Sequence, residues 1–276
     1  MSRTTDQTYL VQQQYKNADN LRARMAIHER FSTNTDNLAR WVFDRMALPE
    51  DARVLELGTG PARLWTENRE RIPAGWHVTL SDLSPGMLEE AQQTTKDIDK
   101  AFDYKVIDAQ DVPFEDDTFD CVVANHMLYH VPDLGKGIAE IRRVLKPGGK
   151  LYAVTNGEKH MRELEAFVAE QFAKPLGAEF EVNTTLSFRL ENGNDLLGNH
   201  FDHVELAVIP NNALKVTEAE PFMAYIFSMN RWQTLLAEAG QDADALVRGA
   251  REELERCLAE DGSVHVTKAT GLFTAW

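Results

Sequence analysis

The sequence has few cysteines and no long apolar run. Two cysteines occur among 276 residues, Cys121 in the apolar stretch DCVVA and Cys257 in a charged stretch, which is too few for a disulfide framework or a cysteine zinc cluster. No stretch approaches the roughly 18 apolar residues typical of a membrane span. The polar N-terminus, MSRTTDQTYLVQQQYK, lacks the apolar centre of a signal peptide. We therefore expect a cytoplasmic protein with no membrane partner.

Positive charge is also scarce. The chain has 29 Lys and Arg residues against 44 Asp and Glu residues, a formal net charge of -15 at pH 7. Such a chain has no overall attraction to a polyphosphate, so nucleic acid is disfavoured as a partner. The hydrophobic content of 43% is enough for a sizeable core. One large domain and one domain with a substantial appendage both remain open.

Short apolar runs alternate with helical patterns between residues 53 and 155. Strands are expected over residues 53–57, 76–82, 104–109, 119–125 and 150–155. Ser84 can cap a helix that begins at Pro85, and a helix from Asp133 ends before the sequence KPGG at 146–149. The alternation predicts an α/β fold with a doubly wound, mostly parallel sheet, whose ligands bind beyond the carboxyl ends of the strands.

The two ends of the chain are less regular. Helices are expected over 18–31 and 35–48, the second with Thr35 or Asp36 as its N-cap. In the last third we expect helices near 162–172, 221–229 and 242–260, and strands over 203–209 and 263–276. Aromatic residues recur between 160 and 250, which favours a partial cap over the sheet; they are Phe180, Phe188, Phe222, Tyr225, Phe227 and Trp232. The alternative is that they only fill the interior of this region.

A glycine-rich loop follows the first expected strand, in the stretch VLELGTGPARLW from Val54 to Trp65. A dinucleotide fingerprint would need Gly or Ala where Arg63 stands, and the Gly-Lys-Ser/Thr ending of a P-loop is absent. The pattern is instead Glu56, Gly58, Gly60 and then the small Ala62. Glycines at these positions let the backbone approach a ligand closely, and no pyrophosphate is required.

With the blocks that follow it, this loop resembles the class I S-adenosylmethionine-dependent methyltransferases, whose first motif is commonly E/D-x-G-x-G-x-G. The later blocks are TLSDLS, VIDAQDVPFEDDTFDCVVANHMLYHVPD and LKPGGKLYAVT, which end at Thr155. The stretch from Val54 to Thr155 is most similar to small-molecule enzymes of the ubiquinone/menaquinone-biosynthesis type. The resemblance implies a Rossmann-like seven-stranded sheet with N-terminal helices and a C-terminal cap insertion. It divides the chain into an N-terminal helical lid (1–50), a donor-binding core (51–158) and a substrate cap with the remaining core strands (159–276).

The resemblance also implies which residues bind the cofactor, S-adenosylmethionine. Asp82 would bind the ribose hydroxyls, Asp108 would accept from the adenine amino group, and Ala109 would offer a backbone contact. The other residues of the implied donor site are Glu56, Gly58, Gly60, Leu83, Asn125, Tyr15 and Arg22, of which Tyr15 and Arg22 are lid contacts to the carboxylate end of the donor. Ala62, in place of the third glycine, would leave less room near the loop. A helix-capping role for Asp82, and solvated helix positions for Tyr15 and Arg22, stay open.

The implied reaction passes a methyl group from a sulfonium to a nucleophile by in-line displacement, which depends mainly on alignment. A general base would help where the acceptor is a hydroxyl or a weakly acidic carbon. His126 and His130 follow the fourth expected strand and are the catalytic candidates, although either can be a hydrogen-bonded structural histidine. Their i,i+4 spacing lacks the Glu of H-E-x-x-H and a third ligand, so no metal site is expected.

The sequence therefore predicts an enzyme that methylates a small organic acceptor on oxygen, carbon or nitrogen. An RNA-modifying methyltransferase is one alternative, disfavoured by the acidic composition and by Asn125-His126-Met127-Leu128 where an Asn-Pro-Pro-Tyr-like motif would stand. A catalytically silent regulatory protein that binds S-adenosylmethionine is another. The identity of the acceptor and the formation of a homo-oligomer stay open.

Overall fold

A seven-stranded sheet with the strand order β3-β2-β1-β4-β5-β9-β6 forms the centre of the molecule. The computed structural model describes residues 5–16, 19–34, 36–178, 186–229 and 239–276. The strands of the sheet are β1 (Arg53–Leu57), β2 (His77–Asp82), β3 (Phe102–Val106), β4 (Phe119–Asn125), β5 (Leu145–Asn156), β6 (Val204–Val208) and β9 (Thr270–Ala275). Strands β1 to β5 pair in parallel, and β9 runs antiparallel between β5 and β6. The predicted doubly wound, mostly parallel sheet is confirmed.

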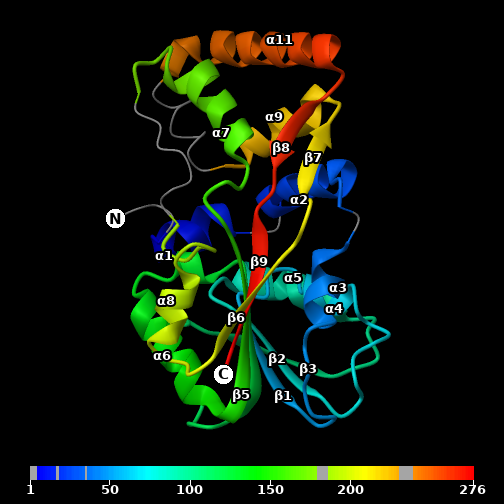
Figure 1. The fold of residues 1–276 in the computed structure, drawn as a ribbon, viewed down its shortest axis with the longest axis vertical. Coiled ribbons are helices and arrows are strands. Elements are labelled where there is room, and N and C mark those ends of the chain that lie inside the picture. Colours follow the sequence, from blue (N-terminus) through cyan, green and yellow to red (C-terminus); the bar gives the residue numbers. More distant parts are fainter. Residues whose placement is uncertain (1–4, 17–18, 35, 179–185, 230–238) are drawn as a thin grey trace.

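Helices cover both faces of the sheet (Figure 1). On one face lie α3 (Leu38–Phe43), α4 (Arg63–Thr66) and α5 (Pro85–Thr95), and on the other α6 (Leu134–Val144) and α8 (Gly193–Gly198). Because side chains alternate along a strand, Leu55 of β1 packs in the cluster under α6, and its neighbour Val54 packs in the cluster under α3 and α4. Both residues are fully buried, as expected for a strand covered on both faces.

Predicted helix ends agree with the structure at two places. Ser84 Oγ accepts from the backbone N–H of Met87 and caps α5, which begins at Pro85. Asp133 Oδ1 accepts from the N–H of Lys136 and caps α6. The prediction of Asp36 as a cap of α3 was wrong, because the N-cap is Asn37. Its Oδ1 accepts from the backbone N–H groups of Ala39 and Arg40.

A second group of elements lies at one end of the molecule, beyond α2 (Asp19–Phe31) in Figure 1. It contains α7 (Arg162–Val168) with the π-helical turn Ala169–Ala173, β7 (Ala213–Val216), α9 (Ala219–Phe227), the 3-10 turn Gly240–Asp242, α11 (Ala243–Asp261) and β8 (Val264–Thr267). Strands β7 and β8 form a separate antiparallel pair. The single strand predicted over 263–276 is therefore wrong: β8 belongs to this small sheet, and β9 returns to the main one. No helix in the described ranges is long and apolar enough to cross a lipid bilayer.

The aromatic residues of this region divide between two clusters. Phe222 and Tyr225 pack with Ile27 and Phe31 of α2 in the core of the end group, and Phe227 packs against it. Phe188 instead lies in the main core, with its ring centroid 5.5 Å from that of Phe273. Phe180 and Trp232 lie outside the described residues. The three-part division of the chain stays a prediction.

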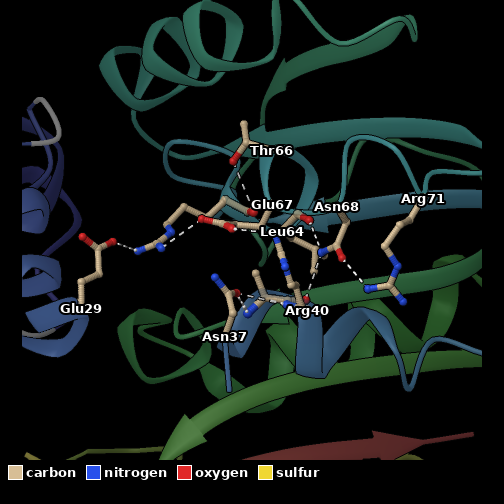
Figure 2. A network of polar contacts seen from close by, with 10 residues as sticks. Glu29, Asn37, Arg40, Leu64, Thr66, Glu67, Asn68 and Arg71 are labelled. Carbon is tan, nitrogen blue, oxygen red and sulfur yellow. Dashed lines mark hydrogen bonds and ion pairs between the residues drawn. The ribbon is translucent and has the colours of Figure 1, made fainter. Parts of the chain in front are cut away.

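Polar contacts attach the N-terminal helices to α4 (Figure 2). The Arg63 guanidinium lies 3.0 Å from Glu29 of α2 and 3.4 Å from Glu67. Asn68, which is buried, donates to the carbonyls of Leu64 at 2.8 Å and Ala39 at 3.2 Å. Half-exposed ion pairs of this kind contribute little stability each. The Arg63–Glu29 pair joins α2 to α4, and the Asn68–Ala39 hydrogen bond joins α3 to the residues after α4.

Candidate active site

A cavity of about 710 Å³ lies at the carboxyl ends of the parallel strands. Its walls include the loops after β1, β2, β4 and β5, together with α2 and the N-terminal segment formed by α1 (Gln7–Tyr9) and the π-helical turn Leu10–Gln14. Cavities of this size hold small-molecule ligands, and this is the edge of an open parallel sheet where ligands bind.

The loop after β1 approaches the segment after β4 so closely that only glycine fits at one position. Gly58 has φ +66°, and a Cβ placed on it would lie 2.7 Å from Met127 Cβ. Under the loop, Glu56 is buried, and its Oε2 accepts from Thr59 Oγ1 and Trp65 Nε1, both at 2.7 Å. Burial raises the pKa of Glu56 to about 7. Glu56 therefore fixes the shape of the loop through hydrogen bonds within it.

Ala62 does not narrow the cavity, contrary to the sequence-based expectation. It is fully buried, lies in the apolar cluster with Trp41 and Trp65, and is not among the residues that line the cavity. Its backbone has φ 55°, a conformation in which a third glycine would be less strained. The substitution thus affects the backbone and the core, and its methyl group does not reach the ligand side of the loop.

Asp82 stands at the end of β2 and links two loops. Its Oδ2 accepts from the N–H of Gly60 at 3.0 Å, and its Oδ1 accepts from the N–H of Ser84 at 2.9 Å. Burial raises the pKa of this carboxyl despite those hydrogen bonds. Because Ser84 caps α5, Asp82 is available to the cavity, which it lines together with Leu83.

Asp108 follows β3 and also lines the cavity, beside Ala109. Its Oδ1 accepts from the N–H of Gln110 at 2.9 Å, and its Oδ2 accepts from Gln7 Nε2 at 2.8 Å. Burial alone would raise the pKa of Asp108, but these hydrogen bonds lower it overall. The contact with Gln7 brings the N-terminal segment across the edge of the sheet.

Asn125 and His126 end β4 inside the same cavity. Asn125 Nδ2 donates to Glu56 Oε1 at 3.5 Å, whereas Asn125 Oδ1 is buried and accepts no hydrogen bond from the described residues. His126 has φ 54°, which is strained for a residue with a side chain. Burial and the positive charges of His130 and Lys268 lower the pKa of His126 to about 4.

Tyr15 and His130 face each other across the cavity wall. Tyr15 Oη and His130 Nε2 are 3.0 Å apart, and His130 lies in the short 3-10 turn Leu128–His130. Ser84 Oγ donates to the carbonyl of Tyr15 at 2.8 Å, which fixes the end of the N-terminal segment over α5. Arg22 is not brought to the site: its side chain is 56% exposed and lies 3.4 Å from Glu90. Residues two apart on a helix face different directions, and Arg24 lines the cavity instead.

Several polar residues of the cavity were not predicted from the sequence; they are Gln7, Arg24, His28, Asn156, His160, Tyr225 and Lys268. Asn156 is the last residue of β5, as Asn125 is of β4, and His160 follows soon after, so the same rule about strand ends could have found them. Lys268 lies between β8 and β9, where the chain passes from the small sheet to the large one. No local pattern indicates that position.

A family model described as a methyltransferase domain matches residues 55–153, the part of the chain that carries this loop and both aspartates. These residues form a class I S-adenosylmethionine-dependent methyltransferase domain. The family resemblance predicted from the motifs is confirmed.

Curated relatives share this domain. A demethylmenaquinone methyltransferase of Clavibacter sepedonicus is 36% identical over 121 residues, which cover 44% of this chain and 48% of that protein. A ubiquinone/menaquinone biosynthesis C-methyltransferase of Desulfotalea psychrophila is 36% identical over 111 residues, which cover 40% of this chain and 44% of that protein. The chain thus spans about half or less of the length of these relatives.

Among solved structures, a putative methyltransferase from Bacillus halodurans has the same fold. It superposes with a TM-score of 0.57 at 15% identity, over 86% of this chain and 97% of that one. The likeness extends beyond the matched domain to most of the chain, and it concerns the fold alone.

Proposed function

We propose that this protein binds S-adenosylmethionine in the cavity and transfers its methyl group to a small organic acceptor. The observation that carries the proposal is the convergence of the Gly58 loop, Asp82 and Asp108 on one cavity at the edge of the sheet. The domain identity of residues 55–153 and the quinone-type relatives support methyl transfer to a small molecule.

The residues present fit this donor. Two carboxylates, Asp82 and Asp108, are suited to accept hydrogen bonds from ribose hydroxyls and from an adenine amino group. Asn125 Oδ1 is a buried acceptor with no partner among the described residues, and a donor ammonium would satisfy it. Gly58, at which a Cβ would overlap Met127, lets the loop after β1 pass along the cavity wall. The ribose, the adenine amino group and the ammonium of the donor would therefore each have a polar partner in the cavity.

When bound, S-adenosylmethionine supplies a methyl group on a sulfonium, which an acceptor nucleophile displaces in line. The chain contributes alignment, which can lower such a barrier by several kcal/mol. The N-terminal segment, attached through Gln7 to Asp108 and through Tyr15 to His130, covers the cavity and limits the access of water.

His126 and His130 are the groups we assign to contact with the acceptor. The lowered pKa of His126 keeps its ring neutral near pH 7, so a ring nitrogen can accept a hydrogen bond from the methyl acceptor. His130 exchanges a hydrogen bond with Tyr15 Oη, which orients its ring. A base at either position would matter for a hydroxyl or carbon acceptor and much less for an amine.

Two other proposals concern the setting of the reaction. Both Cys121 and Cys257 are free thiols, which suits a reducing compartment such as the cytoplasm. The formal net charge of -15 gives no support to an RNA acceptor. The methyltransferase-domain match and the quinone-type relatives do not favour a silent donor-binding protein on the same fold.

The test is incubation of the purified protein with methyl-labelled S-adenosylmethionine and either a small-metabolite extract or total cellular RNA, followed by separation by size. We expect label in a small molecule, and none when the protein is omitted or denatured. Label in RNA would support the alternative acceptor class. A protein that binds the donor but labels nothing would be a silent binder, contrary to the proposal.

A further inference from the structure

Basic side chains gather in one part of the cavity, against the overall charge of the chain. They come from separate elements: Arg24 and His28 from α2, His126 from the end of β4, His160 from the loop after β5, and Lys268 from the connection of β8 to β9. These five are among the seven basic side chains that line the cavity, in a chain whose formal net charge is -15. We call the group of Arg24, His28, His160 and Lys268 the basic subsite.

Lys268 is a fixed positive charge of the basic subsite with no acidic partner in the part of the chain that the structure describes. Its Nζ donates to Ser32 Oγ at 2.8 Å. In the described ranges, no Asp or Glu carboxylate forms an ion pair with it. Burial lowers the pKa of Lys268 to about 8, so the ammonium remains mostly protonated at neutral pH. A half-buried charge without a counter-ion is costly unless a ligand supplies one.

The two histidines of the basic subsite lie together. The rings of His28 and His160 are stacked with centroids 6.2 Å apart, and Tyr225 meets His28 edge-on at 5.9 Å. His160 Nδ1 accepts from the N–H of Ala269 at 3.2 Å, which places the ring proton on Nε2. His28 Nδ1 is buried and has no hydrogen-bond partner among the described residues. Buried polar atoms of this kind are usually hydrogen-bonded, so a bound ligand or a water molecule would be a suitable partner for His28 Nδ1.

Both histidines of the basic subsite are neutral near pH 7, so Arg24 and Lys268 carry its positive charge. Burial and then Lys268 lower the pKa of His28 to about 3, and burial and then His28 lower the pKa of His160 well below its usual value. Of the acids nearby, Glu29 is paired with Arg63 at 3.0 Å. Others that lie near are Asp36, which is exposed, and Glu165, which raises the pKa of Tyr225.

We propose that the basic subsite binds an anionic group, a carboxylate or a phosphate monoester, of the methyl acceptor. The inference rests on the proposed function, because it names the class of acceptor that the same cavity takes. An acceptor with an anionic oxygen group would pair with the Lys268 ammonium and accept from the His160 Nε2–H, whereas a neutral quinol would leave that charge without a partner. The acceptor is therefore a small organic acid or a phosphate ester that carries its nucleophile at a second position.

The experiment uses the full chain saturated with S-adenosylhomocysteine, with benzoate, phenyl phosphate, acetate and inorganic phosphate as probes and benzamide as the neutral analogue. Calorimetry measures affinity, and NMR of the histidine ring nitrogens follows His28 and His160. We expect at least one anion to bind about tenfold or more tightly than benzamide, and to raise the pKa of both rings. The carboxylate and phosphate probes distinguish the two kinds of anion.

Variants connect the binding to the basic subsite. Lys268→Met and Lys268→Gln should each weaken anion binding about tenfold or more, while the affinity for S-adenosylhomocysteine stays within about twofold. The matched control is Lys215→Met, which changes an exposed lysine of β7 outside the cavity and should alter neither affinity.

Three outcomes would overturn the inference: no probe anion perturbs the two rings at millimolar concentration, benzamide binds as tightly as the anions, or both Lys268 variants retain anion affinity. In each case, binding of S-adenosylhomocysteine would show that the proposed donor site is unaffected. Loss of that binding in the unmodified protein would instead contradict the proposed function. The two failures are therefore distinguishable.

Discussion

Replacing Gly58 with alanine should damage both stability and donor binding. An alanine at φ +66° costs about 1–2 kcal/mol in backbone strain. The new Cβ would also lie 2.7 Å from Met127 Cβ, an atom close to the backbone that cannot rotate away, and relieving that overlap costs about 1–3 kcal/mol. Reduced freedom of the unfolded chain offsets about 0.4–1 kcal/mol. We expect a net loss of about 1–5 kcal/mol in the free energy of unfolding.

Gly148→Ala is the matched control, because this glycine has φ +77° and open space around a Cβ. It should show the backbone strain without the overlap, and so lose about 1 kcal/mol. Urea unfolding measures both variants, and calorimetry measures their affinity for S-adenosylhomocysteine. Gly58→Ala should weaken that affinity about tenfold or more, and the control should not. Equal losses of stability in the two variants would refute the close approach of the loop to Met127.

Three further predictions concern the acids and the lid. Burial raises the pKa of Glu56 from 4.5 to about 7. Between pH 4.5 and about pH 7, the folded state therefore keeps a proton that the unfolded state has released. The free energy of unfolding should fall as the pH rises through this range. Glu56→Gln should make the free energy of unfolding, measured with urea, depend less on pH over this range. An unchanged dependence on pH would contradict the raised pKa of Glu56. Asp82→Asn should weaken S-adenosylhomocysteine binding about tenfold or more in calorimetry, with exposed Asp103→Asn as a control that has no effect; equal affinities would remove Asp82 from the donor site. Ser84→Ala should lose about 1 kcal/mol of stability through the missing cap, and limited proteolysis of residues 5–16 should accelerate because the hydrogen bond to Tyr15 is gone; unchanged proteolysis would show that this contact does not fix the segment.

Local signals in the sequence were sufficient for the parallel strands of the main sheet and for the starts of two of its helices. Strand β4 was predicted with its observed bounds, because a continuous apolar run between polar residues is typical of a strand covered on both faces. The caps Ser84 and Asp133 were likewise visible, since capping depends on residues within one turn. Strand β7 was missed because its partner, β8, lies far away in the sequence.

The part of the cavity assigned to S-adenosylmethionine was more predictable from the sequence than the basic subsite. Gly58, Asp82 and Asp108 each follow a strand, and the sheet brings strand ends together at one edge. Lys268 and His28 meet only because α2 packs between the main sheet and the small one. Such contacts depend on tertiary packing, which no periodicity in a single sequence encodes. Arg22 illustrates the limit, because the helix was predicted but the side that faces the cavity was not.

The most direct test of the central claim is a calorimetric titration of the unmodified protein with S-adenosylhomocysteine. The convergence of the Gly58 loop, Asp82, Asp108 and Asn125 on one cavity predicts saturable binding with one site per chain. The absence of binding by well-folded protein at millimolar ligand would contradict the donor site and with it the proposed function.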